Sequence, residues 1–309
     1  MEKRKKKKII IGVILGFGLL IFGILLTIPF LIINPMVNKH VDFNKVWTAK
    51  EFGIEAEHFF VKTDDGLNIS AYEVAVENPK AIIICLSGFS NPSATIYFGH
   101  ARFFKEHDYA TILFDMRAHG ESDGDMICLG YKEFLDTRAI VQHIKAKPAY
   151  NNVPIVVFGL SMGGATAINS IGEIPEIDGL ISLSAYSSVE DYLYEDMATQ
   201  APVFFAKIVK PFVTLATILK FKVNSWSVNP KKEIEKLGSR PALLMHTKGD
   251  AGVSFSNFER ILSHSPPHVE TFIREGNIHF VTKNFTEPEK DTEYATKLLQ
   301  FLDKNFSER

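Results

Sequence analysis

Short apolar runs recur along the chain from residue 57 onward. The first two, Glu57 to Lys62 and Leu67 to Val76, alternate apolar and polar positions around the turn Thr63 to Gly66, which predicts a β-hairpin. The later runs are rich in Ile, Val and Leu, as is typical of strands buried on both faces. They are Ala81 to Leu86, Tyr109 to Phe114, Val153 to Phe158, Gly179 to Leu183, Pro241 to His246 and Val269 to Ile273.

Helical patterns separate these runs. They cover Thr95 to His107, Tyr131 to Lys147, Met162 to Ile171, Ser256 to Leu262 and Glu289 to Asn305. Strands that alternate with helices predict an α/β fold, in which a mostly parallel central sheet carries helices on both faces.

The interval between Leu183 and Pro241 contains no convincing strand, which predicts a helical cap inserted at about 188–239. Its middle is dense in apolar residues, but Lys207, Lys210 and Pro211 disfavour a second membrane span there. We expect its apolar side chains to line a substrate pocket, or alternatively only to pack the cap onto the core. These side chains are Phe204, Phe205, Ile208, Phe212, Leu215 and Leu219.

The N-terminal pattern is different, because residues from Ile9 to Ile33 carry no charge. As a helix this stretch would be about 37 Å long at about 1.5 Å per residue, enough to cross a hydrocarbon core of about 30 Å. It is too long for a signal-peptide core and lacks a small-residue cleavage site, so we expect a retained anchor. Gly12 and Gly16 form a GxxxG pair that would allow two anchors to pack, which is a weak signal, and the oligomeric state stays open.

Charge sets the expected orientation of this anchor. Residues 3–8 are all basic, whereas only Lys39 and Lys45 follow the span closely, so the positive-inside rule places the N-terminus in the cytoplasm and the large domain outside it. The formal net charge is −2, and the first eight residues contribute +5 of it, which leaves −7 for the remainder. An acidic body without a basic stripe excludes nucleic acid as an expected partner.

The chain is thus divided into a basic cytoplasmic tail (1–8), a transmembrane anchor (9–33), a linker (34–56) and an α/β domain (57–309) that includes the cap insertion. Its two cysteines, Cys85 and Cys128, lack the spacing of a zinc site or a disulfide scaffold, and we expect no metal or other cofactor.

A GxSxG motif, Gly159 to Gly163, lies between a predicted strand and a predicted helix. In such a nucleophile elbow the turn is tight enough to expose a strained serine, and flanking glycines avoid clashes. Ser161 is therefore the candidate nucleophile. A serine hydroxyl needs a base to take its proton and an acid to orient that base.

Acid and base candidates follow two later strands in the required order. Asp250 is the acid in the loop after the strand that ends at His246, and His279 is the histidine in the loop after the next strand. Glu190 or Asp191 is next in line should Asp250 not be the acid. The oxyanion hole is assigned to the N–H groups of Met162, which follows the nucleophile, and of Phe89, in the loop Ser87 to Pro92.

With these motifs, residues 57–305 resemble the α/β-hydrolase superfamily, and within it the bacterial esterase, lysophospholipase and serine-aminopeptidase-like branch. Asp115 to Ser122 is similar to the superfamily's D-x-R-G-H-G-x-S segment, in which the histidine, here His119, is structural. Two positions depart from the pattern: Ser87 stands where His is usual before the oxyanion loop, and Thr247 where Gly is common. The resemblance implies the α/β-hydrolase fold and a serine hydrolase.

We expect hydrolysis of a carboxylic ester on a small-molecule or lipid-like acyl substrate, through an acyl-enzyme intermediate. Amide or peptide hydrolysis, or acyl transfer to an acceptor other than water, would use the same triad and stays open. A non-catalytic binding domain is the more distant alternative, against which the intact set Ser161, Asp250 and His279 argues.

Overall fold

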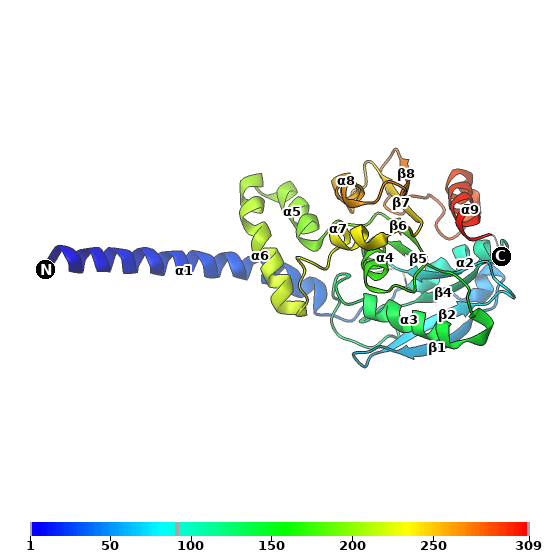
Figure 1. Ribbon diagram of the computed structural model, residues 1–309. Helices are drawn as coiled ribbons and strands as arrows, with labels where there is room; N and C mark the ends of the chain where they lie inside the picture. The colour runs from blue at the N-terminus through cyan, green and yellow to red at the C-terminus, as the bar shows by residue number, and fades with distance from the viewer. Residues whose placement is uncertain (1, 90–92, 308–309) are drawn as a thin grey trace.

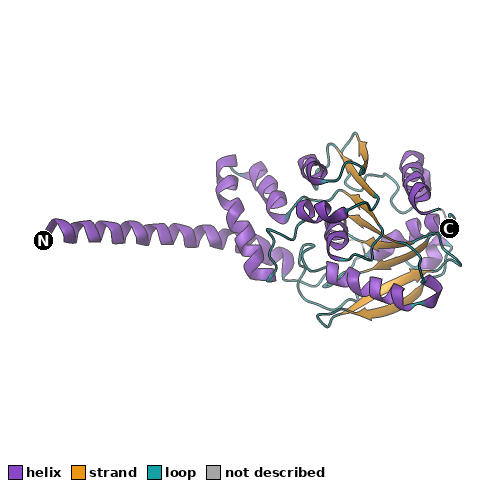
Figure 2. Cartoon of the chain, in the orientation of Figure 1, coloured by secondary structure: helices purple, strands orange, loops and turns teal. Residues whose placement is uncertain are grey.

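The structure, a computed structural model, describes residues 2–89 and 93–307 (Figures 1 and 2). Eight strands form one sheet in the order β1-β2-β4-β3-β5-β6-β7-β8. The β1–β2 and β2–β4 pairs are antiparallel and the other pairs are parallel. The strands are β1 (Glu57–Lys62), β2 (Asn68–Val74), β3 (Ile82–Leu86), β4 (Ala110–Phe114), β5 (Ile155–Leu160), β6 (Gly179–Leu183), β7 (Ala242–Thr247) and β8 (Glu270–Arg274).

Helices cover both faces of this sheet, as predicted. The main helices of the body are α2 (Phe98–Lys105), α3 (Phe134–Ala146), α4 (Met162–Glu173), α8 (Phe255–His264) and α9 (Thr292–Phe306). Helices α3, α4 and α8 share one hydrophobic core, and α2 and α9 share the other. Strand β3 contributes to both cores, because Ile82 and Ile84 face the first while Ile83 and Cys85 face the second.

The predicted α/β-hydrolase fold is confirmed, and the predicted strands match the observed ones to within two residues at most boundaries. The parallel strands β3 to β7 are buried along their whole length on both faces, which is why they appear in the sequence as continuous apolar runs, whereas the edge strand β8 is only partly buried. Cys85 and Cys128 are both buried and unpaired.

The N-terminal segment forms one long helix, α1 (Glu2–Val37), which projects from the body (Figure 1). Its part from Arg4 to Val37 is long and apolar enough to cross a membrane. The helix continues past Ile33, the expected end of the span, to Val37. Pro29, Ile33 and Val37, spaced four residues apart on one face, are buried against the body.

The segment expected to be a linker also contacts the body. The Val41 N–H donates to the Ala118 carbonyl at 2.8 Å, and the Gly120 N–H donates to the Val41 carbonyl at 2.9 Å. A 3₁₀ turn, η1 (Ala49–Phe52), follows, and the rings of Phe52 and Phe98 lie 6.2 Å apart. Residues 38–56 therefore fix the position of α1 relative to the sheet.

The insertion after β6 is helical. It contains α5 (Val189–Gln200), α6 (Val203–Phe221), α7 (Pro230–Glu233) and the turn η4 (Ile234–Leu237). Helices α5 and α6 lie on the side of the body from which α1 emerges (Figure 1), and α6 packs directly on α1. The rings of Phe22 on α1 and Phe212 on α6 are 5.4 Å apart in an edge-to-face arrangement.

Candidate active site

Ser161 lies in the tight turn between the end of β5 and the start of α4. Its backbone has φ 59° and ψ −118°, a conformation that costs a non-glycine residue about 1–3 kcal/mol. The turn is held by the Ser161 N–H, which donates to the Leu183 carbonyl at 2.8 Å, and by the Ala165 N–H, which donates to the Ser161 carbonyl at 3.0 Å. This is the strand-turn-helix geometry that the GxSxG motif predicts.

The glycines on either side of Ser161 are required by close backbone contacts. A Cβ at Gly159 would overlap the Gly163 carbonyl, and a Cβ at Gly163 would overlap the carbonyls of Leu86 and Ser87. The turn is thus folded tightly upon itself and against the end of β3. Only glycine at both positions leaves room for that packing.

Asp250 and His279 come from the loops after β7 and β8 and meet at the carboxyl ends of the strands. His279 Nδ1 lies 2.8 Å from Asp250 Oδ2 and 3.0 Å from Oδ1. Asp250 Oδ1 also accepts from the N–H groups of Gly252 at 2.8 Å and Val253 at 3.1 Å. Burial raises the pKa of Asp250, but these hydrogen bonds, led by that from His279, outweigh it and bring the pKa below its ordinary value.

Three further residues contact His279 or Asp250. The Ser184 hydroxyl donates to the His279 carbonyl at 2.7 Å. Gly252 packs against the ring so closely that a Cβ there would lie 3.0 Å from Nδ1. His246 is fully buried with Nε2 3.6 Å from Asp250 Oδ2, and burial lowers its pKa, so a neutral ring faces the carboxylate. The sequence analysis did not identify these residues as part of the site.

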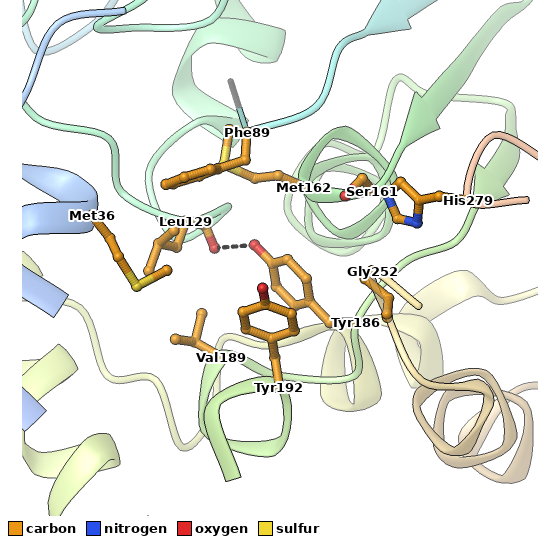
Figure 3. A pocket seen from close by; sticks show the side chains of 11 residues that line it. Met36, Phe89, Leu129, Ser161, Met162, Tyr186, Val189, Tyr192, Gly252 and His279 are labelled. Atoms are coloured by element: carbon orange, nitrogen blue, oxygen red, sulfur yellow. Dashed lines mark hydrogen bonds between the residues drawn. The ribbon is translucent and has the colours of Figure 1, made fainter. Parts of the chain in front are cut away.

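Ser161 and His279 line the same pocket, a cavity of about 190 Å³, and lie side by side at one end of it (Figure 3). Among the described residues no hydrogen bond joins Ser161 Oγ to His279. Catalytic hydrogen bonds are often long before substrate binds. Asp250 does not line this pocket and borders a neighbouring pocket.

Phe89 and Met162, assigned to the oxyanion hole from the sequence, also line this pocket. Met162 is the first residue of α4, where backbone N–H groups have no partner within the helix. Phe89 is held from behind by His119, whose Nε2 lies 2.9 Å from the Phe89 carbonyl oxygen. The remainder of the predicted loop, Ser90, Asn91 and Pro92, lies outside the described residues.

The rest of the pocket wall is almost entirely apolar, and most of it was not predicted. It consists of Met36, Leu129, Tyr186, Val189, Tyr192, Gly252 and Val253. The Tyr186 hydroxyl donates to the Leu129 carbonyl at 2.8 Å, so the polar end of this side chain has a partner within the pocket wall (Figure 3). The predicted start of the insertion could have indicated that Tyr186 to Tyr192 lie near the pocket. Nothing in the sequence indicated this for Met36, on the last turn of α1.

The expectation that α6 lines the pocket is wrong. The insertion contributes to the cavity wall through α5, while Phe212 of α6 packs on α1 and Phe204 and Ile208 are exposed. A helix with apolar residues on more than one face has several surfaces to bury, and the sequence does not say which one faces the active site.

Glu190 and Asp191, the reserve candidates for the acid, have other partners. Asp191 pairs with Lys210 and Lys231, each at 2.5 Å, and these lysines lower its pKa despite burial, which acts to raise it. Glu190 accepts from the Tyr131 hydroxyl at 3.1 Å, and burial raises its pKa. Within the described part of the chain, no group of three or more His, Cys, Asp or Glu side chains is placed to hold a metal ion.

A sequence model of the hydrolase family described as "Serine aminopeptidase, S33" matches residues 77–273, well over half of the chain. The chain belongs to this family of α/β hydrolases. It is 25% identical over 236 residues to the uncharacterized protein YqkD of Bacillus subtilis, covering 75% of this chain and 76% of that protein. It is also 22% identical over 147 residues to the uncharacterized membrane protein YNL320W of Saccharomyces cerevisiae, covering 47% of this chain and 51% of that protein.

Solved structures show the same fold. The esterase Pf2001 of Pyrococcus furiosus superposes with a TM-score of 0.67 at 24% sequence identity, covering 88% of this chain and 98% of the esterase. The α/β hydrolase GrgF of a Penicillium species superposes with a TM-score of 0.64 at 16% identity, covering 82% of this chain and all of that structure. The protein is therefore a hydrolase with the α/β-hydrolase fold.

Proposed function

We propose that this hydrolase cleaves a carboxylic ester through an acyl-enzyme intermediate, with Ser161 as nucleophile, His279 as general base and Asp250 as the acid that orients it. The proposal rests on the contact of 2.8 Å between His279 Nδ1 and Asp250, because His279 lines the same pocket as Ser161. A carboxylate at Nδ1 favours the tautomer with the proton on that atom. Nε2 is then free to accept the proton of Ser161 Oγ.

The first step forms a bond between Ser161 Oγ and the acyl carbon while His279 Nε2 takes the hydroxyl proton. The oxygen of the tetrahedral intermediate becomes negative, and the N–H groups of Met162 and Phe89 would stabilise it. His279 returns its proton to the departing alcohol as the ester C–O bond breaks. A water molecule, deprotonated by His279, then attacks the acyl-enzyme and releases the carboxylic acid and Ser161.

Asp250 serves this cycle by remaining ionised while His279 gains and loses a proton. Its carboxylate accepts hydrogen bonds from two backbone N–H groups and from His279, which stabilise the charged form although the side chain is fully buried. A charged partner at Nδ1 stabilises the imidazolium formed during acyl transfer.

The apolar pocket wall supports an uncharged acyl group as substrate. Among the described residues that line the cavity there is no Asp or Glu, so an amino-acid residue with a free ammonium group would find no countercharge there. Peptide or amide hydrolysis remains the second candidate because of the family's description, and acyl transfer to another acceptor uses the same intermediate. Comparing an alkyl ester with the matching aminoacyl amide separates these activities.

Labelling by a fluorophosphonate probe tests the nucleophile directly. The full-length protein should react, and Ser161→Ala should abolish labelling and lower esterase activity by about 10⁴-fold or more, since triad residues act as a unit. Ser263→Ala, which removes an exposed serine on α8, is the matched control and should behave as wild type. Labelling of Ser161→Ala at the wild-type rate would refute the assignment.

We also propose that α1 anchors the enzyme in a membrane, with the N-terminus in the cytoplasm. Support comes from the length and composition of the helix and from the six basic residues before its apolar part. Protease added to whole cells should then digest the domain. Protection that persists until the membrane is opened would show that the domain faces the cytoplasm.

A further inference from the structure

The cap helix α6 presents an apolar face that the protein does not cover. Phe204 is 67% exposed, and Val203, Ile208 and Leu219 are each about half exposed along the same helix. The helix carries Lys207, Lys210 and Lys220 and no acidic residue. Exposed Phe and Ile side chains together with lysines are typical of helices that lie at the surface of a membrane.

Helix α6 crosses α1 rather than running alongside it (Figure 1). The contact includes Phe22 with Phe212 in the middle of α6, and near the C-terminal end of α6 Lys220 Nζ donates to Asn38 Oδ1 at 2.7 Å. Because Ile33 and Val37 of α1 are fully buried in the body, α1 and α6 are held together by the fold. If α1 spans a membrane, the depth of α6 is fixed with it.

The depth follows from helix geometry. Lys8 is the last charge before the apolar stretch, so the hydrocarbon core begins near Ile9. About 20 residues at about 1.5 Å each cross a core of about 30 Å, which then ends near Ile28. On the same scale Phe22 lies about 10 Å inside that boundary. The helix that contacts Phe22 is therefore also at the level of the lipid.

The catalytic pocket extends toward the same region. Met36, on the last turn of α1, forms the end of the pocket opposite Ser161 and His279 (Figure 3). It lies about 12 Å beyond Ile28 along the helix, about 5 Å outside a headgroup layer that is about 5–7 Å thick. An acyl chain that leaves the leaflet beside α1 thus meets the apolar end of the pocket first.

From this arrangement we infer that α6 and the exposed part of α1 form one lipid-facing surface, which seats the cap in the leaflet on the domain's side and admits acyl esters carried in that leaflet. The occupant of the α6 face is membrane lipid, because that face continues the exposed surface of α1. The substrate part of this inference rests on the proposed ester hydrolysis. The docking of α6 does not.

Depth-dependent fluorescence quenching tests the docking without requiring activity. Trp47→Phe and Trp226→Phe remove both native tryptophans, and Phe204→Trp then places a single tryptophan on α6 in the full-length chain. In phosphatidylcholine vesicles we expect quenching by lipids brominated along the acyl chain. The control is Phe60→Trp in the same background, since Phe60 is 52% exposed on β1, at the edge of the sheet away from α1, and should not be quenched.

Activity tests the consequence for substrate. Phe204→Asp and Ile208→Asp should each lower hydrolysis of an ester embedded in the vesicles by about tenfold or more, because a large apolar side chain loses its lipid contact. Hydrolysis of soluble p-nitrophenyl butyrate in the same vesicles should not change, and Phe60→Asp should alter neither rate.

The outcomes separate the two proposals. Quenching at position 204 in a protein that hydrolyses no ester would leave the docking intact and contradict the proposed function. Absence of quenching overturns the docking, above all if Phe204→Cys forms a disulfide between two chains, since the face would then be a dimer interface. An equal loss of activity on the soluble and the embedded ester would show that α6 supports the structure of the active site and does not give access to lipid substrates.

Discussion

Replacing Ile33 with alanine should destabilise the hydrolase domain although Ile33 belongs to the helix expected to span the membrane. Its side chain has no exposed surface, because it packs into the same hydrophobic core as the sheet and α4. Truncation of a fully buried Ile to Ala costs about 2–5 kcal/mol. Leu31, two residues earlier, is 70% exposed on the other face of α1, and Leu31→Ala should change stability by about 0.5 kcal/mol or less.

Urea unfolding of the full-length protein in detergent micelles measures the difference. With a urea dependence of about 3 kcal/mol per molar, a loss of about 3 kcal/mol lowers the midpoint by about 1 M for Ile33→Ala, and by little for Leu31→Ala. Equal midpoints for the two variants would refute the docking of α1. If the two midpoints differ as expected, a soluble form should retain the last turns of α1. Removal of residues 1–37 would take Ile33 and Val37 out of the core and Met36 out of the pocket.

Three other changes have calculable effects. Met36→Trp should fill the end of the pocket and shorten the preferred acyl chain, with kcat/KM reduced roughly fourfold for each methylene excluded, as measured on p-nitrophenyl esters from acetate to dodecanoate. Gly163→Ala should cost more than about 4 kcal/mol or prevent folding, because its Cβ would overlap the Leu86 carbonyl. Gly88→Ala, whose Cβ would meet no atom closer than 3.7 Å, should fold normally, and circular dichroism and thermal unfolding compare the two. Asp250→Asn should remove about 1.5–3 kcal/mol of stability near neutral pH. The folded-state pKa of Asp250 is depressed, so this stabilisation is complete above the unfolded pKa of about 3.9 and is lost as pH falls through the folded pKa. The difference in unfolding free energy between wild type and variant should therefore be constant above about pH 5 and decrease below it. A difference that grew in acid would contradict the stabilising contact between Asp250 and His279.

The elements of this protein follow from local sequence patterns. Strands such as β3 and β5 are buried on both faces and therefore appear as short unbroken apolar runs, whose length and β-branched composition favour strands over helices. The turn that holds Ser161 is equally local, because the clashes that require Gly159 and Gly163 arise within a few residues of Ser161 and at the end of the adjacent strand. Chain order and strand ends were enough to predict that Asp250 and His279 would approach each other, although their roles stay predictions.

What the tertiary structure alone decided is which surfaces meet. The residues that hold His279 in place, such as Ser184 and Gly252, have no distinguishing sequence pattern, since their effect depends on a distance set by two different loops. The apolar residues of α6 satisfied the pattern of a pocket lining, but burying a face against α1 and burying it against a substrate leave the same pattern in the sequence. Met36 shows the limit most clearly. The apolar part of α1 has no polar face, so only the packing of Ile33 and Val37 against the body determines that its last turn lines the pocket of Ser161.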